Sequence, residues 1–304
     1  MIDLSVQIGS LKLKNPVLTA SGCFGVGREY SELYDISNLG GIVTKTITLQ
    51  PREGNPPPRI WETAAGMLNS IGLAGPGIET FIAEEIPFLR KLECARIVSV
   101  AGETIAEFAE LIKQLGPIEG VDVYELNVSC PNVEHGGMAF GKDCGVIKEL
   151  MAEVRPITGK PVWVKLTPNV TDIVEIGRAA VEGGADALCA INTLLGMAID
   201  IRTRKPRLGG VTGGLSGPAI LPVALAKVHQ LYDALPETPI IGIGGIGGPE
   251  DAIAHMIVGA TAVQIGSGQF SYPRLPLDTI DSIAEYCMEM RIPNATNITG
   301  SLII

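Results

Sequence analysis

The stretch that decides the fold is "KPVWVKLTPNVTDIVEIGRAAVEGGADALCAIN", residues 160–192. It begins with a short apolar run rich in β-favouring residues, continues with a segment of helical periodicity at 172–185, and ends with a second apolar run. Runs that are apolar at consecutive rather than alternate positions are typical of strands buried on both faces of a parallel sheet. The stretch therefore predicts a strand, a helix and a second strand parallel to the first.

The same pattern recurs along the chain. Eight short apolar runs occupy residues 15–22, 40–45, 95–102, 121–128, 160–167, 185–192, 238–245 and 261–268. Most of the gaps between them carry helix-period stretches, such as "TIAEFAELIKQLG" at 104–116. Eight strands that alternate with helices predict an α/β fold of the TIM-type (β/α)8 barrel class. A doubly wound open sheet is the structural alternative.

Three segments do not belong to a minimal barrel. "SVQIGSLKLKNP" (5–16) alternates around a Gly-Ser turn, which predicts an N-terminal hairpin that closes the barrel floor. Residues 46–77 and 193–218 are rich in Gly and Pro, and they predict two long irregular loops after the second and sixth strands. Both loops would lie at the C-terminal face, where barrel enzymes have their active sites. We expect residues 1–304 to form a single domain.

Composition narrows the classes of partner. The chain has 304 residues, 46% of them hydrophobic, and 23 basic against 33 acidic residues give a net charge of −10. This balance disfavours nucleic acid and anionic membranes as partners. We expect no signal peptide in "MIDLSVQIGS" and no membrane span, because the longest apolar runs are far shorter than the ~20 residues that a spanning helix needs. The six cysteines form no C-x-x-C pair, so we expect no metal site and a cytoplasmic location.

Polar residues follow several predicted strands. Lys45 ends the second, Asn127 the fourth and Asn192-Thr193 the sixth, while the fifth carries Lys165. Because the carboxyl ends of parallel barrel strands meet at one rim, we expect these side chains to converge there. Cys130 also lies beyond the fourth strand, in a polar loop before a proline, whereas the other five cysteines are typical of inert apolar residues.

Two glycine-rich turns, "GIGGIGG" (242–248) and "QIGSG" (264–268), end the seventh and eighth strands. Bare backbone amides at such turns can approach an anion closely, so the pair predicts a phosphate group at this rim.

Residues alone leave two enzyme classes open. One is a flavin enzyme with its phosphate on the glycine turns, Lys165 beside the isoalloxazine and Cys130 as a base. The other is a lyase in which Lys165 or Lys45 forms a Schiff base with a phosphorylated carbonyl substrate. A barrel that only binds a ligand fits poorly with so many polar residues at the rim. A flavin protein would be yellow as purified.

Three motifs carry a resemblance to a known family: "NVSCPNVEHGGMAFG" (127–141), "TLQPREGNPPPRIWETAAGMLNSIGL" (48–73) and "LGMAIDIRTRKP" with "GGLSGPAI" (195–206 and 213–220). Together they closely resemble the dihydroorotate dehydrogenases of class 1, subtype B, over essentially the whole chain. The resemblance implies an FMN-containing barrel that oxidises (S)-dihydroorotate to orotate in pyrimidine biosynthesis. It also implies a homodimeric core in a heterotetramer, with electrons passing to NAD through a partner subunit that carries FAD and a [2Fe–2S] cluster. A self-sufficient fumarate-dependent enzyme is the alternative.

The resemblance also implies roles for single residues. It places hydride transfer from C6 of dihydroorotate to flavin N5, with Cys130 as the base that takes the C5 proton and Lys45 among the catalytic residues. The implied FMN contacts are Ser21, Lys45, Thr46, Ser99, Asn127, Lys165, Ile191, Gly217, Gly244, Gly245, Gly266 and Ser267. The implied substrate contacts are Lys45, Asn69, Ser70, Ile71, Gly72, Leu73, Asn127, Asn192 and Thr193. Two positions depart from the family pattern: Ala74-Gly75 replaces Gln-Asn, and Ser99 replaces Asn.

Overall fold

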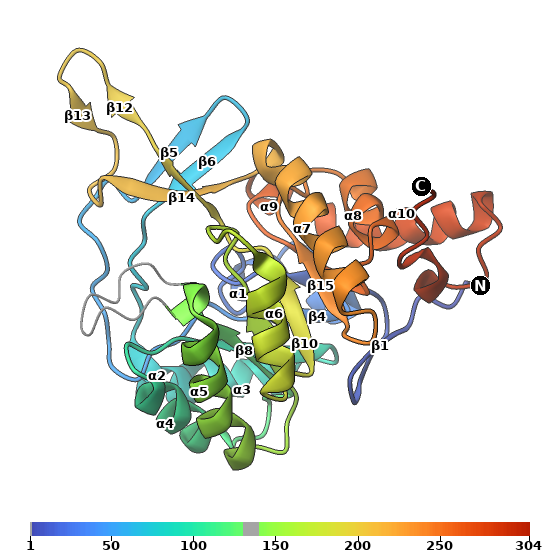
Figure 1. The fold of residues 1–304 in the computed structure, drawn as a ribbon, viewed down its shortest axis with the longest axis horizontal. Coiled ribbons are helices and arrows are strands. Elements are labelled where there is room, and N and C mark those ends of the chain that lie inside the picture. Colours follow the sequence, from blue (N-terminus) through green and yellow to red (C-terminus); the bar gives the residue numbers. More distant parts are fainter. Residues whose placement is uncertain (1, 130–139) are drawn as a thin grey trace.

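The computed structural model describes residues 2–129 and 140–304, and its centre is a closed barrel of eight parallel strands (Figure 1). The barrel strands are β3 (Val17–Thr19), β4 (Gly41–Val43), β7 (Ala95–Val100), β8 (Val123–Asn127), β9 (Val162–Lys165), β10 (Ala187–Ala190), β15 (Ile240–Ile243) and β16 (Ala262–Ile265). Around the barrel they follow the order β10-β15-β16-β3-β4-β7-β8-β9. Each strand falls within one of the eight apolar runs. The TIM-type barrel is therefore confirmed, and the open-sheet alternative is wrong.

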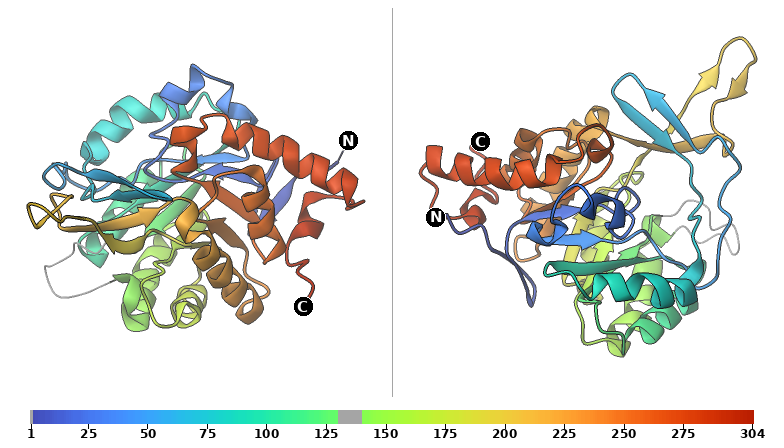
Figure 2. Two further views of the ribbon diagram at one scale, coloured as in Figure 1. Left: turned by 90° about the horizontal axis from the view of Figure 1, so that it is seen from above. Right: turned by 180° about the vertical axis from the view of Figure 1, so that it is seen from behind.

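Helices cover the outside of the barrel (Figure 2). The longer ones are α4 (Ile105–Leu115), α5 (Cys144–Val154), α6 (Ile173–Glu182), α7 (Leu221–Ala234), α8 (Pro249–Ile257) and α10 (Leu275–Glu289). The short ones are α1 (Arg28–Ser31), α2 (Gly77–Thr80), α3 (Ile86–Leu89) and α9 (Gly268–Ser271). Side-chain caps fix several starts, because Thr104 accepts from the Glu107 amide at 3.2 Å and Asp172 from the Val174 amide at 2.7 Å. Capped amphipathic helices thus alternate with the strands, as the periodicity predicts.

Alternate residues of the barrel strands face opposite ways. Val123 and Trp163 pack in the barrel interior together with Ile8, whereas their neighbours Tyr124 and Val164 belong to a second apolar cluster with the outer helices. Ile8 belongs to the hairpin of β1 (Val6–Ile8) and β2 (Leu11–Leu13), which pairs antiparallel. The turn of this hairpin faces the residue just before β10. The hairpin therefore closes the N-terminal end of the barrel, as expected from the sequence.

The two Gly- and Pro-rich segments are more ordered than the sequence predicts. They contain β5 (Ile60–Thr63), β6 (Gly66–Asn69), β11 (Leu194–Met197) and β14 (Thr212–Ser216), which form one antiparallel sheet in the order β11-β14-β6-β5. A small hairpin of β12 (Ile199–Asp200) and β13 (Lys205–Pro206) extends from it, away from the barrel (Figure 1). The expectation of irregular loops is wrong here. Each segment forms a pair of strands of its own, β5 with β6 and β11 with β14, and the pairing of β6 with β14 joins the two segments.

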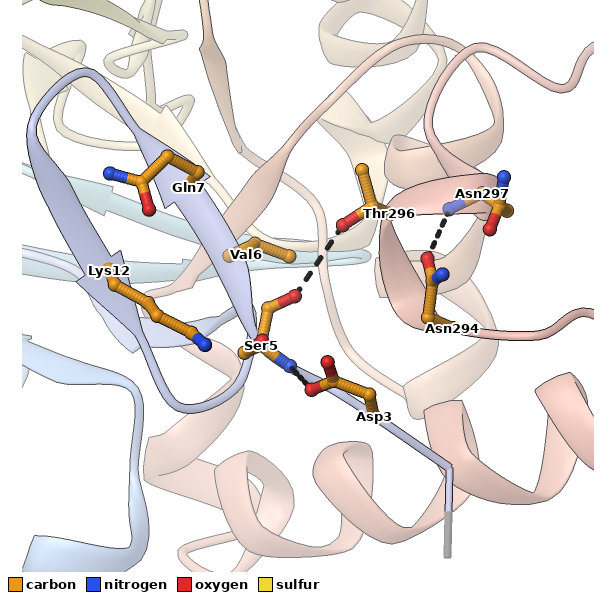
Figure 3. A pocket seen from close by; sticks show the side chains of 8 residues that line it. All are labelled: Asp3, Ser5, Val6, Gln7, Lys12, Asn294, Thr296 and Asn297. Carbon is orange, nitrogen blue, oxygen red and sulfur yellow. Dashed lines mark hydrogen bonds between the residues drawn. The ribbon is translucent and has the colours of Figure 1, made fainter.

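The two ends of the described chain lie together on the opposite side of the molecule from this sheet (Figures 1 and 2). The amide of Ala295 donates to the carbonyl of Asp3 at 3.0 Å, and Thr296 Oγ1 donates to the carbonyl of Ser5 at 3.5 Å. A shallow polar hollow lies between the first strand and this C-terminal turn, Ala295–Ile298 (Figure 3). Among the described helices, none combines the length and the apolar character that crossing a bilayer requires.

Candidate active site

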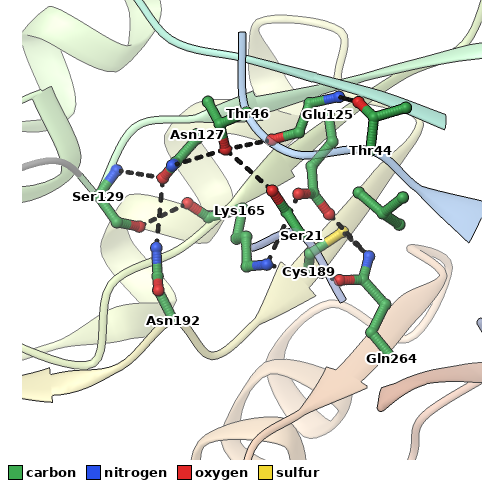
Figure 4. Close-up of polar contacts among 12 residues, drawn as sticks. Ser21, Thr44, Thr46, Glu125, Asn127, Ser129, Lys165, Cys189, Asn192 and Gln264 are labelled. Carbon is green, nitrogen blue, oxygen red and sulfur yellow. Dashed lines mark hydrogen bonds and ion pairs between the residues drawn. The ribbon is translucent and has the colours of Figure 1, made fainter. Parts of the chain in front are cut away.

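Thr46 connects four strands of the barrel at the C-terminal rim (Figure 4). This buried residue follows β4, and its Oγ1 lies 3.0 Å from Ser21 Oγ, beyond β3, and 2.9 Å from Ser99 Oγ on β7. Asn127 Nδ2, at the end of β8, donates to the same oxygen at 3.4 Å. Ser99 itself is fully buried behind Thr46. Serine at this position thus supports the side chain of Thr46 from within the barrel.

Asn127 extends the network toward the sixth barrel strand. Its Oδ1 accepts from Asn192 Nδ2 at 3.2 Å and from the Ser129 amide at 3.3 Å. Ser129 Oγ in turn donates to the carbonyl of Lys165 at 2.9 Å, and Asn192 Oδ1 accepts from the amide of Thr193 at 2.8 Å. The polar residues predicted at strand ends therefore do converge on one rim, where they offer amide donors and acceptors side by side.

Below this rim lies a buried charged cluster (Figure 4). Lys165 is 5% exposed, and its Nζ lies 3.6 Å from Glu125 Oε1 and 3.5 Å from Gln264 Oε1. Gln264 Nε2 donates to Glu125 Oε2 at 2.7 Å and approaches Cys189 Sγ at 3.8 Å. Because Nζ points into the barrel, a Schiff base at Lys165 would require this cluster to be broken.

Sequence reasoning missed Glu125 and Gln264. Both are fully buried and lie on β8 and β16. A signal was present, since each stands directly between two large hydrophobic residues of a strand-like run, in "YEL" (124–126) and in "VQI" (263–265). An unpaired polar group is costly to bury, so such a residue calls for a partner inside the barrel. The sequence does not show which partner, because Glu125 and Gln264 are 139 residues apart.

The glycine turns after β15 and β16 are shaped by close packing. Gly244 and Gly245 have φ of +118° and +81°, and a Cβ on Gly245 would lie 2.4 Å from the Leu221 Cα at the start of α7. A Cβ on Gly217, which has φ of +99°, would likewise lie too close to the Gly66 Cα. Among the described residues, no acceptor is paired with the backbone amides of Gly245 and Ser267. Two turns with open amides therefore lie at neighbouring strand ends, next to Gly266.

His255 supports the first of these turns from behind. It is fully buried on α8, and its Nε2 lies 2.9 Å from the carbonyl oxygen of Gly244. A carbonyl only accepts, so Nε2 carries the proton and donates. Burial lowers the pKa of His255 to about 4, which keeps the ring neutral at physiological pH. Ile191 is also buried and lies beside Gly244, and the peptide bond before it is cis.

The predicted substrate loop, residues 69–73, begins at the end of β6. Asn69 Nδ2 donates to the carbonyl of Gly214 on β14 at 3.2 Å, and Thr193 packs against the other side of Gly214. Ser70 Oγ accepts from Asn55 Nδ2 at 2.8 Å, and the carbonyl of Ile71 accepts from the Asn55 amide at 3.0 Å. Gly72 and Leu73 both have positive φ, 73° and 57°. The four-stranded sheet and Asn55 together hold the loop in place.

The departures at Ala74 and Gly75 fit this local structure. Gly75 pairs with Arg52 through two backbone hydrogen bonds of 2.9 and 3.0 Å, and the Ala74 methyl group packs against Gly54. A Cβ on Gly54, which has φ of +79°, would lie 2.7 Å from the Ala74 Cβ. The change from the family pattern therefore occurs where the loop is held by backbone pairing and close packing at its C-terminal end.

Three further residues complete the candidate set. Lys45 is half-buried beyond β4, and its amide donates to the Gly25 carbonyl at 2.8 Å. Cys23 adjoins Gly266, and burial raises the pKa of its thiol to about 11 against the opposing effect of the Lys165 charge. Cys130 lies outside the described residues, so the role implied for it stays a prediction.

Comparison with known proteins identifies one family. The sequence profile of the dihydroorotate dehydrogenase family matches residues 3–286. The chain is 51% identical over 300 residues to the dihydroorotate dehydrogenase B (NAD(+)) catalytic subunit of Alkaliphilus oremlandii, and the match covers 99% of each chain. It is 52% identical over 301 residues to the protein of the same name from Thermoanaerobacter pseudethanolicus, again with 99% of both covered.

A solved structure supports the fold. The crystal structure of DHODH from Eimeria tenella in complex with ferulenol superposes with a TM-score of 0.82, over 98% of this chain and 88% of that one. The two sequences are 22% identical, so this likeness concerns the architecture of the barrel.

Proposed function

The chain belongs to the dihydroorotate dehydrogenase family, and on that premise we propose that it is the catalytic subunit of a dihydroorotate dehydrogenase B. It would oxidise (S)-dihydroorotate to orotate in pyrimidine biosynthesis. The observation that carries the proposal is the network of Thr46, Asn127 and Asn192 above the buried Lys165, on the same rim as the two open-amide turns. Full-length identity of about half to subunits of this name supports the same function.

FMN fits the residues at the rim. The open amides of Gly245 and Ser267, at neighbouring strand ends, are suited to the phosphate group. Ser21, Thr46 and Asn127 offer hydrogen-bonding groups along the rim, Ile191 offers an apolar wall, and Lys165 offers a positive charge at the other end. Bound FMN would supply a two-electron acceptor for the hydride that the substrate loses. The remaining tasks belong to side chains of this chain.

Those tasks are binding, orientation and proton transfer. Orotate is a planar anion with amide donors and acceptors at its edge, and Asn69, Asn127 and Asn192 supply the complementary groups. Thr193 and Lys45 would complete the binding set, with the Lys45 ammonium compensating the carboxylate. Cys130, at the loop beyond β8, would take the C5 proton as a thiolate. Lys165 would stabilise negative charge that develops beside it.

We further propose that the chain works with other subunits. The relatives are named catalytic subunits of NAD(+)-dependent enzymes, which supports a partner that passes electrons to NAD. By family resemblance this partner would carry FAD and a [2Fe–2S] cluster, around a homodimeric core in the cytoplasm. Exposed large apolar side chains on the four-stranded sheet and its hairpin support contact with another protein: Ile60, Trp61, Leu195, Met197, Ile199 and Ile201.

Anaerobic titration of the purified chain with dihydroorotate tests the function directly. The flavin absorbance near ~450 nm should bleach completely, because a reduced flavin loses this band. The supernatant after heat denaturation should contain FMN, about one per chain. A folded protein that releases FAD or no flavin, or a flavin that dihydroorotate does not bleach, would refute the proposal.

A further inference from the structure

Glu125 and Gln264 occupy the barrel interior immediately below the rim, where neither can touch solvent. On β8, Glu125 is two residues before Asn127, so both side chains face the inside, with Asn127 nearer the rim. Both Glu125 and Gln264 are 0% exposed. A carboxylate at such a depth is rare unless it has a specific partner, and here the partner is the ammonium of Lys165.

The three side chains form a closed triangle. Gln264 uses its amide nitrogen to donate to Glu125 Oε2 at 2.7 Å and its amide oxygen to face Lys165 Nζ at 3.5 Å. The other carboxylate oxygen, Glu125 Oε1, lies 3.6 Å from the same ammonium and has no hydrogen-bond partner among the described residues. The amide of Gln264 is thereby fixed in orientation, since both of its ends are used.

This arrangement holds the ammonium without saturating it. An ammonium has three N–H donors. In a normal N–H···O hydrogen bond the nitrogen and the oxygen lie roughly 2.7–3.2 Å apart. The two contacts of Lys165 Nζ with described residues, at 3.5 and 3.6 Å, are both longer. Lys165 therefore retains donor capacity toward the rim, while the carboxylate behind it compensates its charge.

We propose that Glu125 and Gln264 are positioning residues that hold the Lys165 ammonium against the ring of the bound flavin. In this arrangement Gln264 fixes the place of the ammonium, and the negative charge of Glu125 limits how strongly its positive charge acts on the ring. The inference rests on the proposed function, because it requires flavin at this rim. It gives a role to two buried polar residues that take no part in the hydrogen-bond network of Thr46, Asn127 and Asn192.

Glu125→Gln tests the effect of the charge. The variant keeps the size and shape of the side chain and removes its negative charge, so Lys165 acts on the flavin uncompensated. We expect the reduction potential of the bound flavin, measured with a chemical reductant and a reference dye, to become more positive. Glu182→Gln is the matched control, because Glu182 pairs with Lys148 on the surface, and the potential should not move. A wild-type reduction potential in the Glu125→Gln protein would show that Glu125 has a structural role alone, and it would overturn the proposal.

Gln264→Met tests the positioning and serves also if Glu125→Gln does not fold. Methionine matches the length of glutamine but makes neither the contact with Glu125 nor the contact with Lys165. The Lys165 ammonium is then no longer held in place in the free protein, so FMN binding must order it. FMN release from the loaded protein on dilution should accelerate by up to about tenfold. Gln114→Met on the outer helix α4, where the described side-chain hydrogen bond of Gln114 is to Glu110, should leave the release rate unchanged.

The decisive measurement is the same substitution in a Lys165→Met background. If Gln264 acts through Lys165, Gln264→Met should add nothing once the lysine is gone, because residues that act as a unit are not additive. The same acceleration in both backgrounds would overturn the proposal. None of these measurements uses dihydroorotate, so a protein that binds FMN but fails to oxidise dihydroorotate would refute the proposed function while this test still stands.

Discussion

Asn127 is the single residue on which most of the rim depends. Its amide nitrogen donates to Thr46, and its amide oxygen accepts from both Asn192 and the backbone of Ser129. This one side chain therefore joins the proposed flavin contacts to the proposed substrate contacts. Asn69, by contrast, makes one described side-chain bond, to the Gly214 carbonyl, and lies on the substrate side alone.

This difference predicts two distinct variants. Asn127→Ala leaves several partly buried groups without partners, at a cost of about 1–3 kcal/mol each, so both orotate affinity and the flavin absorption spectrum should change. Asn69→Ala should weaken orotate binding by about tenfold or more and leave the flavin spectrum intact. Spectral titration of the oxidised protein with orotate measures both effects. If both variants bind orotate with wild-type affinity, the substrate site does not lie at this rim.

Cys130 carries the proton transfer in the proposed mechanism. A serine hydroxyl is far less acidic than a thiol, so Cys130→Ser should slow flavin reduction by roughly 10²-fold or more at neutral pH. The loss should shrink as the pH rises, while orotate affinity changes little. Stopped-flow reduction by dihydroorotate across a pH range measures this. Cys144→Ser is a suitable control, because Cys144 begins the outer helix α5. An unchanged rate in Cys130→Ser would assign the base to another group.

Helix α8 is the element that links the proposed phosphate-binding turn to the pH dependence of stability. Its His255 donates to the Gly244 carbonyl and is kept neutral by burial, with a pKa lowered to about 4 from an ordinary 6.5. Between these two pH values the unfolded chain binds a proton that the folded chain does not. The contribution of His255 to the free energy of unfolding is therefore full above about pH 6.5 and falls as the pH drops toward 4.

We expect the free energy of unfolding to fall with decreasing pH in this window, with His255 contributing up to about 1.4 kcal/mol per pH unit. His255→Gln keeps a donor for the turn but does not titrate, so its stability should depend less steeply on pH. Urea unfolding of this variant and of the wild-type protein at several pH values between 4 and 7 gives the slopes. Identical slopes for the two proteins would contradict the buried neutral state of His255.

Elements also show what the sequence could and could not predict. The eight barrel strands were predictable because strands buried on both faces carry continuous apolar runs, a local signal. The sheet that joins β6 and β14 was not, since its pairing depends on contacts across 145 residues. Lys165 was predicted among the residues of the rim, but its buried partners Glu125 and Gln264 were not. A linear sequence does not show which inward positions of different strands come face to face.

At the scale of the whole molecule, the barrel should depend on a partner for its NAD reaction. One proposed flavin site accounts for the eight strands and the rim loops, and the cysteines of the sequence lack the clustered spacing of an iron–sulfur centre. The isolated chain with dihydroorotate should reduce small dyes briskly and NAD only very slowly. Adding an FAD and [2Fe–2S] subunit should restore NAD reduction. Brisk turnover of the lone chain with NAD or with fumarate would show that no partner is needed.

The pairing of β6 with β14 also sets an order of events during synthesis on the ribosome. Asn69 emerges 145 residues before Gly214, to which it bonds, and translation at about 5–20 residues per second makes this a wait of roughly 7–30 seconds. A two-stranded hairpin is marginally stable alone, so β5 and β6 have no lasting structure during that time. The loop proposed to bind the substrate thus gains its bond to the sheet only when β14 arrives. A nascent chain released before residue 212 would lack the strand that fastens this loop.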